Sequence, residues 1–185
     1  RPSQIRIAQE TMDIYAPLAN RLGIHWLQIE LQELSLKYLD PEGNATLKAK
    51  LDAITRAKES YLENIVEQIR AKLAELDHPD AEVSWRIKHI FSVYQKLVRQ
   101  GIPLEKVYDV LGVRIKMNTV AECYEMLGII HSMWKPIQAR IKDFIAMPKE
   151  NFYQSLHTTV FGPEGERIEI QIRTFEMDYI ANEGI

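Results

Sequence analysis

The strongest constraint on the fold is a strict alternation of apolar and polar side chains between residues 167 and 173. The apolar members are Ile168, Ile170 and Ile172, and the polar members are Glu169, Gln171 and Arg173. Because successive side chains of a strand point to opposite faces, this run predicts a strand with one buried face and one polar face. Residues 156–161 predict its hairpin partner, since the turn at 162–166 contains glycine and proline. The polar face requires an explanation beyond packing.

The rest of the second half alternates between extended and helical patterns. Strands are expected at 81–87, 107–117 and 143–147, and helices at 89–99, 120–132 and 174–182. Together with the hairpin, these elements predict an α+β fold in which helices flank a mixed five-stranded sheet.

The first half of the chain is helical by its spacing of apolar residues. Helices are expected over 5–19 and 24–39, followed by a turn at 40–44 and a long amphipathic helix that ends near residues 77–79. We therefore expect a helical segment at 1–80 and an α+β domain at 81–185. The apolar stripes of the first half predict core packing, and a partner-binding surface is the alternative.

Composition limits the location and the partners of the chain. No apolar run approaches the roughly 20 residues that span a bilayer, so no membrane contact is expected. The single Cys123 cannot form an internal disulfide, which fits a reduced thiol in a cytoplasmic protein. A net charge of −3 and a pI of about 6.0 argue against bulk nucleic-acid binding.

Two acids that interrupt apolar runs are the candidate metal ligands. Asp109 lies in the run 107–111 and Glu169 in the run 168–170, where an unpaired charge is costly. Mg²⁺ is usually bound by one or two carboxylates together with substrate phosphates, so the pair could hold such an ion. A solvated sheet face, or salt bridges to Arg114 or Arg173, is the alternative.

Basic residues gather between residues 84 and 100, a stretch without any acid. Lys88, Ser92 and Lys96 recur every four residues, which predicts that they share one face of the helix that Arg86 leads into. This face could hold a triphosphate, or it could be an ordinary solvated stripe.

A polar block follows at 149–159. Lys149, Asn151 and Tyr153 offer a cation, an amide and an aromatic ring, which could pair with a phosphate, bond the edge of a base and stack on it. His157 follows in the next strand and could point at the same site. An ordinary turn and a structural histidine are the alternatives.

Four ordered motifs give the second half a specific resemblance. They are RIKHIFSVYQK at 86–96, YDVLGVR at 108–114, AMPKENFYQSLHTT at 146–159 and EIQIRT at 169–174. Residues 81–185 resemble the synthetase domain of the RelA/SpoT family of (p)ppGpp synthetases, which implies a nucleotidyltransferase-like fold. Residues 1–25 resemble the helices that close the preceding hydrolase domain of that family.

The resemblance implies a pyrophosphokinase of the stringent response that requires Mg²⁺. In this reaction the 3′-hydroxyl of GDP or GTP attacks the β-phosphorus of ATP, and AMP leaves. The implied catalytic and metal-binding residues are Asp109 and Glu169. The implied ATP-binding residues are Arg86, Lys88, Ser92, Lys96 and Arg114, and the implied GDP- or GTP-binding residues are Lys142, Lys149, Asn151, Tyr153 and His157. A non-catalytic module that binds guanine nucleotide or the alarmone is the alternative.

The resemblance also bears on the parent protein. Residues 140–143 resemble the basic signature of family members with both synthetase and hydrolase activities, which implies a bifunctional parent. The hydrolase metal motif would then lie before residue 1. Contacts with the ribosome or tRNA would depend on regions outside this chain, so no direct nucleic-acid partner is expected for residues 1–185.

Three features depart from what the family pattern implies. The family usually has glycine where Phe152 and Trp85 stand, and a bulky residue at 152 could restrict the backbone. Asp109 and Arg114 are five positions apart, so they would face opposite sides of a regular strand unless Gly112 introduces a bulge.

Overall fold

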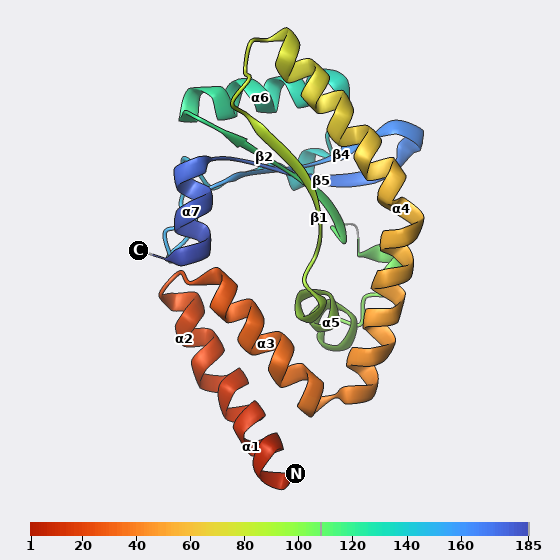
Figure 1. The fold of residues 1–185 in the computed structure, drawn as a ribbon, viewed down its shortest axis with the longest axis vertical. Coiled ribbons are helices and arrows are strands. Elements are labelled where there is room, and N and C mark those ends of the chain that lie inside the picture. Colours follow the sequence, from red (N-terminus) through yellow and green to blue (C-terminus); the bar gives the residue numbers. More distant parts are fainter. Residues whose placement is uncertain (108, 185) are drawn as a thin grey trace.

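The computed structural model describes residues 1–107 and 109–184 and has an α+β architecture (Figure 1). Its five-stranded sheet has the order β1-β2-β5-β4-β3. The strands are β1 (Glu82–Ile87), β2 (Leu111–Met117), β3 (Lys142–Asp143), β4 (Leu156–Phe161) and β5 (Arg167–Thr174). β2 and β5 are parallel, and the other neighbours are antiparallel. The mixed sheet expected from the sequence is confirmed.

Helices lie before, between and after the strands in the chain and surround the sheet. They are α1 (Pro2–Glu10), α2 (Ala16–Arg21), α3 (His25–Leu39), α4 (Pro41–Glu75), α5 (Ile90–Arg99), α6 (Val120–Met133) and α7 (Phe175–Glu183). A π-helical turn at Thr11–Tyr15 joins α1 to α2, and 3₁₀ turns occupy Leu104–Lys106, Gln138–Arg140 and Pro163–Gly165. In Figure 1, α4 runs along one side of the molecule from the N-terminal helices to the sheet. No helix in the described ranges is long and apolar enough to cross a bilayer.

Helix α4 begins earlier than the sequence pattern indicates, and the turn expected at 40–44 is wrong. Asp40 is the N-cap residue, and its Oδ1 accepts a hydrogen bond from the Gly43 N–H at 2.9 Å. Pro41 occupies the first helical position, where a missing N–H group costs nothing because that group would have no partner in the helix. The turn-forming residues are therefore the cap and first turn of α4.

The apolar face of the sheet packs against α4 and α6. The core cluster includes Ile168, Ile170 and Ile172 of β5, Ile65, Val66, Ile69 and Leu73 of α4, and Cys123, Met126 and Ile130 of α6. All three isoleucines of β5 are at most 1% exposed. The alternation expected for β5 is confirmed, and its polar side chains lie on the opposite face.

This core crosses the expected domain boundary at residue 80. The buried side chains of α4 precede the boundary, whereas those of the strands follow it. The division into 1–80 and 81–185 stays a prediction about domains. In the packing, the second half of α4 belongs with the sheet.

A second buried cluster joins the first half of α4 to α5 and to the loop before β2. It contains Leu47 and Leu51 of α4, Val93 of α5, and Val107 and Val110 of the loop. Val107 and Val110 lie on either side of Asp109 in the chain. Their burial holds Asp109 beside the edge of the sheet.

The strand expected at 107–117 begins only at Leu111. The segment before it forms the 3₁₀ turn at Leu104–Lys106 and then buries its valines against α5 instead of pairing with β1. Asp109 therefore lies in a loop, and the prediction that it interrupts a strand is wrong.

The strand expected at 143–147 also ends early, at Asp143. Asp143 Oδ1 accepts hydrogen bonds from the backbone N–H groups of Ile145 at 2.9 Å and Ala146 at 2.8 Å. Such local bonds from an aspartate favour a turn over a strand. The chain leaves the sheet here and forms the loop that carries Lys149 and Tyr153.

We predict that Ile69→Ala on α4 lowers the free energy of unfolding by about 2–5 kcal/mol, since it removes buried methyl groups and leaves a cavity. Ile69 is 0% exposed. The measurement is urea denaturation followed by circular dichroism. The matched control is Val98→Ala at a side chain that is 61% exposed, where a change within about 0.5 kcal/mol is expected. Equal effects of the two substitutions would contradict the packing of α4 on the sheet.

Candidate active site

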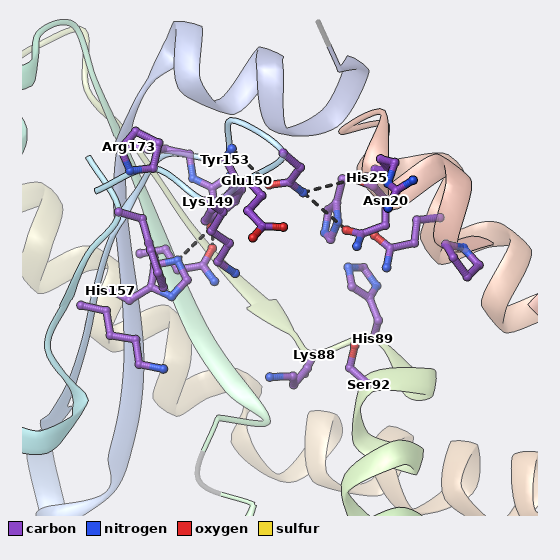
Figure 2. A pocket seen from close by; sticks show the side chains of 18 of the residues that line it. Asn20, His25, Lys88, His89, Ser92, Lys149, Glu150, Tyr153, His157 and Arg173 are labelled. Atoms are coloured by element: carbon purple, nitrogen blue, oxygen red, sulfur yellow. Dashed lines mark hydrogen bonds between the residues drawn. The ribbon is translucent and has the colours of Figure 1, made fainter. Parts of the chain in front are cut away.

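A large cavity opens on the polar face of the sheet. Its volume is about 1460 Å³, which exceeds the range of about 300–1,000 Å³ usual for one small-molecule site. Its walls come from all five strands, the loop after β3, the start of α5, and the N-terminal helices α2 and α3. Figure 2 shows Asn20 and His25 of the N-terminal helices across the cavity from Lys149 and His157. The cavity has room for more than one small ligand.

Eleven of the twelve residues predicted from the sequence line this cavity. They are Arg86, Lys88, Ser92, Asp109, Arg114, Lys142, Lys149, Asn151, Tyr153, His157 and Glu169. The other is Lys96, which does not line the cavity but contacts Asp109. Residues that are far apart in the sequence thus meet at one place.

The Asp109 carboxylate is held by two lysines. Lys88 Nζ donates to Oδ2, and Lys96 Nζ lies 2.8 Å from both oxygens. Burial by itself raises the pKa of Asp109, but the hydrogen bonds from Lys88 and Lys96 outweigh burial and lower the pKa to about 2. The side chain is therefore ionised at neutral pH. In the alternative to a metal site, Asp109 would be solvated or pair with Arg114 or Arg173, whereas its partners in the structure are the two lysines.

The position of Asp109 also removes the difficulty with Arg114. Arg114 lies inside β2, opposite Gln171 of β5 and Ser84 of β1. Because Asp109 precedes the strand, the alternation of side chains does not apply to it. Both side chains line the cavity, and Gly112 is paired in the regular ladder with Arg86 and Glu169.

Gln171 connects the acid of β5 to two guanidinium groups. Its Nε2 donates to Glu169 Oε1 at 2.9 Å. Its Oε1 accepts from Arg86 Nη1 at 3.1 Å and from Arg173 Nη2 at 2.6 Å. The sequence motif contains Gln171 and Arg173, but neither is among the predicted site residues. The alternation that placed them on the polar face was the signal that could have found them.

Three rings, two from the loop after β3 and one from β4, form an edge-to-face cluster. They belong to Phe144, Tyr153 and His157, with centroid separations of 5.2–6.2 Å. Tyr153 Oη lies 2.8 Å from His157 Nε2. The ammonium group of Lys149 is 4.7 Å from the Phe144 centroid and 4.9 Å from the Tyr153 centroid. Tyr153 therefore has a fixed orientation with a cation beside its ring.

The turn before Tyr153 explains why a bulky residue is accommodated at 152. Phe152 has φ of +65° and its side chain points outward, 59% exposed. Its N–H donates to the Lys149 carbonyl at 2.8 Å. A positive φ favours glycine, so Phe152 adopts a conformation that strains a larger residue. The Phe152 side chain does not line the cavity.

The N-terminal helices supply a wall of the cavity that sequence reasoning missed. Asn151 Nδ2 donates to the carbonyl of Asn20 at 3.3 Å and lies 3.4 Å from its side-chain oxygen. Arg21, His25 and Gln28 also line the cavity. No motif marked these residues, because their spacing is that of an ordinary helix and only the fold brings them to the sheet.

Two histidines meet where this wall reaches α5. The rings of His25 and His89 are 5.9 Å apart in an edge-to-face arrangement. Burial, followed by the charge of Arg86, lowers the pKa of each histidine to about 4. Both rings are therefore neutral at pH 7, and the cations of the site remain the arginines and lysines.

The cavity carries an excess of positive charge. The cationic residues that line it are Arg21, Arg86, Lys88, Arg114, Lys142, Lys149 and Arg173, and the acidic residues are Asp13, Asp109, Glu150 and Glu169. Seven cations face four acids. A concave site of this sign attracts anionic ligands such as phosphate esters.

Two of the acids could hold a divalent cation. No group of three or more His, Cys, Asp or Glu side chains suited to a metal occurs within residues 1–107 and 109–184. Mg²⁺ needs only one or two carboxylates when phosphates complete its shell. Asp109 and Glu169 line the same cavity as lysine and arginine side chains that can bind phosphate. The two carboxylates therefore suit a metal ion that binds together with a phosphate ligand.

Comparison with known proteins identifies the family. Residues 85–185 match the region found in RelA / SpoT proteins. The chain belongs to the RelA/SpoT family. A "GTP pyrophosphokinase" from Myxococcus xanthus is 53% identical over 182 residues, covering 98% of the chain and 24% of that relative. A "guanosine-3′,5′-bis(diphosphate) 3′-pyrophosphohydrolase" from Aquifex aeolicus is 46% identical over 97% of the chain and 26% of its own length. The chain therefore spans about a quarter of these RelA/SpoT relatives.

Solved structures of small alarmone synthetases share the fold. Small alarmone synthetase 1 from Bacillus subtilis, bound to its product pppGpp, is 25% identical with a TM-score of 0.57, covering 72% of this chain and 78% of that one. A GTP pyrophosphokinase family protein from Streptococcus pneumoniae is 28% identical with a TM-score of 0.56, covering 72% of each chain. The expected nucleotidyltransferase-like fold of the RelA/SpoT synthetase region is confirmed.

We predict a pH dependence of stability that His157 contributes. Burial, followed by the charges of Arg173 and Lys149, lowers the pKa of His157 to about 3. Between this value and about 6.5 the unfolded chain binds more protons than the folded chain, so stability falls as the pH falls. From pH 7 to pH 5, His157 should account for a loss of about 1–2 kcal/mol.

The measurement is urea denaturation at pH 7 and pH 5 for the wild type and for His157→Gln, which cannot titrate. The variant should lose less stability than the wild type over this interval. The same loss in both proteins would mean that His157 does not titrate with a lowered pKa.

Proposed function

We propose that this chain is a (p)ppGpp synthetase that transfers the β,γ-pyrophosphate of ATP to the 3′-hydroxyl of GDP or GTP. The observation that carries the proposal is the convergence of eleven predicted site residues on one cationic cavity with room for two nucleotides. Support also comes from relatives named GTP pyrophosphokinase and from a structural neighbour that binds pppGpp.

The proposed ATP side lies where β1, β2 and α5 meet. Arg86, Lys88, Ser92, Lys96 and Arg114 would bind the triphosphate and the adenine. Lys88 and Lys96 share the Asp109 carboxylate. A phosphate group that takes over these ammonium groups would leave Asp109 available to a cation, because each lysine can exchange one anionic partner for another.

The proposed acceptor side lies around the loop after β3. Tyr153 would stack on the guanine, and Asn151 would bond the edge of the base. Lys142, Lys149 and His157 would contact the acceptor's phosphates. Since His157 is neutral at pH 7, it would act there as a hydrogen-bond donor, and the positive charge would come from the two lysines.

The proposed reaction breaks one bond and forms another at the β-phosphorus. The acceptor 3′-oxygen bonds to this phosphorus, the bond to the α,β-bridging oxygen breaks, and AMP leaves with that oxygen. Glu169 would take the proton of the hydroxyl or share a cation with Asp109. Bound Mg²⁺ would offset the negative charge of the phosphates, and Asp109 and Glu169 would hold it.

The activity of the whole protein is a wider proposal. Among the relatives, one is named for pyrophosphate transfer and another for a different reaction, the hydrolysis of a guanosine 3′-pyrophosphate. This supports the expectation of a bifunctional parent. A cytoplasmic location, the absence of direct nucleic-acid contacts for this chain, and ribosome or tRNA contacts through other regions stay predictions.

We predict that Asp109→Asn and Glu169→Gln each lower product formation on the order of 100-fold or more, because an acid–base or charge-neutralising group is lost. Purified protein would be incubated with Mg²⁺, ATP and GDP or GTP, and AMP and the 3′-pyrophosphorylated product separated by anion-exchange chromatography. Asp13→Asn is the matched control, since Asp13 also lines the cavity but has no proposed role.

The binding of nucleotides separates this enzyme from a sensor. Both acid variants should bind GDP within about threefold of the wild type, since their role lies in the transition state and not in the ground state. Wild-type protein that binds GDP but releases no AMP would favour a regulatory module that binds guanine nucleotide or alarmone.

We predict that Tyr153→Ala weakens GDP binding by about 1–3 kcal/mol if the ring stacks on the base. Isothermal titration calorimetry with GDP measures this loss. Tyr153→Trp keeps a stacking surface and is expected to retain more of the affinity. Unchanged GDP affinity in Tyr153→Ala would remove Tyr153 from the site.

A further inference from the structure

Asp178 on α7 lies between three cations but belongs to no motif that the sequence singled out. Its side chain is 13% exposed. Oδ1 is 3.5 Å from Arg114 Nη1 and 3.4 Å from Arg173 Nη1, and Oδ2 is 3.7 Å from Lys116 Nζ. Within the described residues, Asp178 does not line the cavity, so it cannot be a catalytic residue by contact.

Its two guanidinium partners face different halves of the cavity. Arg114 lies on the side proposed for ATP. Arg173 Nη2 donates to Tyr153 Oη at 2.9 Å and therefore supports the ring proposed to stack on the acceptor base. The Asp178 carboxylate thus contacts one arginine beside each proposed subsite.

Arg173 needs an anion because it is buried. Its side chain is 3% exposed. Burial lowers the pKa of Arg173, and the neighbouring Arg114 and Arg86 lower it further, whereas Tyr153 and Asp178 raise it. A buried guanidinium without a counter-charge is strongly unfavourable.

The two acids proposed to act in catalysis have other partners. Asp109 is bonded to Lys88 and Lys96, and Glu169 accepts from Gln171. Asp178 is the acid whose salt bridges reach Arg114 and Arg173 in the described part of the chain.

The orientation of Arg114 depends on few bonds, whereas Nη2 of Arg173 is also held by Gln171 and Tyr153. The Nε atoms of Arg114 and Arg173 are buried and have no hydrogen-bond partner among the described residues. Arg114 Nη1 has Asp178 as its ion-pair partner. Without this carboxylate, a long side chain with several rotatable bonds would have more freedom to leave the cavity wall.

We propose that Asp178 is a positioning residue shared by the two substrate subsites: it orients Arg114 toward ATP, and through Arg173 it orients Tyr153 toward the acceptor. This inference rests on the proposed assignment of the two subsites. Its consequence is that one substitution outside the cavity weakens the binding of both nucleotides.

The test is the binding of GDP and of a non-hydrolysable ATP analogue to Asp178→Asn, each alone, by calorimetry. Both dissociation constants should rise by about 3- to 30-fold, in the range of couplings between residues of one hydrogen-bond network. Asp178→Glu keeps the charge and should restore most of both affinities. Circular dichroism verifies that the variants are folded.

Two controls separate positioning from a general loss of structure. Glu176→Gln removes an exposed acid from the same helix and should leave both constants unchanged. In an Arg114→Gln background, Asp178→Asn should no longer weaken the binding of the ATP analogue but should still weaken the binding of GDP. If Asp178→Asn alone does not fold, the double variant with Lys116→Met removes one charge of each sign and is measured against Lys116→Met.

The binding measurements test the role of Asp178 whether or not the protein catalyses the proposed reaction. A folded Asp178→Asn protein with unchanged affinities, or with only one affinity lowered, would overturn it. A fall in melting temperature with both affinities intact would also overturn it, because Asp178 would then serve stability alone. Wild-type protein that binds both nucleotides without forming product would refute the proposed synthesis while leaving the positioning role testable.

Discussion

The constraint on which the site depends is the two-sided character of β5. One side of the strand must be excluded from water, and the other carries charged and polar groups that are themselves largely enclosed. Gln171 is 6% and Arg173 only 2% exposed. Groups of this kind are stable only when every charge has a counter-charge or a hydrogen-bond partner, so the polar face is a connected network. Gln171 is its centre, because the amide can donate to Glu169 and accept from Arg86 and Arg173 at the same time.

Different helices pack on the apolar face and on the polar face of β5. α4 and α6 contribute buried apolar side chains to the core on one face of β5. α5 and the N-terminal helices bring polar side chains to the cavity on the other face, and Figure 2 shows Ser92 of α5 and Asn20 and His25 of the N-terminal helices there. α7 brings Asp178 to Arg114 and Arg173. The loop before β2 joins these two kinds of packing. Its valines are buried against α4 and α5, while Asp109 between them points to the lysines.

The sequence predicted the elements whose signals are local. Strict alternation identified β5, and apolar spacing identified α5 and α6, with ends within one or two residues of those observed. Predictions failed where tertiary contacts decided the outcome. The valines before Leu111 are strand-like in sequence but bury against a helix, and the turn-like residues at 40–44 cap one.

For the site too, local motifs were predictable and tertiary contacts were not. Residues within ordered motifs gathered as expected at one cavity, because the motifs lie on the polar face of the strands and in the loops beside it. Asn20 and His25 could not be predicted, since their contribution depends on how α2 and α3 pack against the loop after β3. The partners of Asp109 were also missed, because an ion pair between residues of separate elements leaves no spacing to detect.

The extent of the packing has a practical consequence for dividing this chain. The family match covers residues 85–185, yet the apolar side of the sheet is covered by α4 and one wall of the cavity comes from α2 and α3. A recombinant piece cut to the matched region would keep α6 but lose the cover by α4 and the wall from α2 and α3. It would expose the isoleucines of β5 to solvent and leave an open surface where the intact chain has an enclosed site.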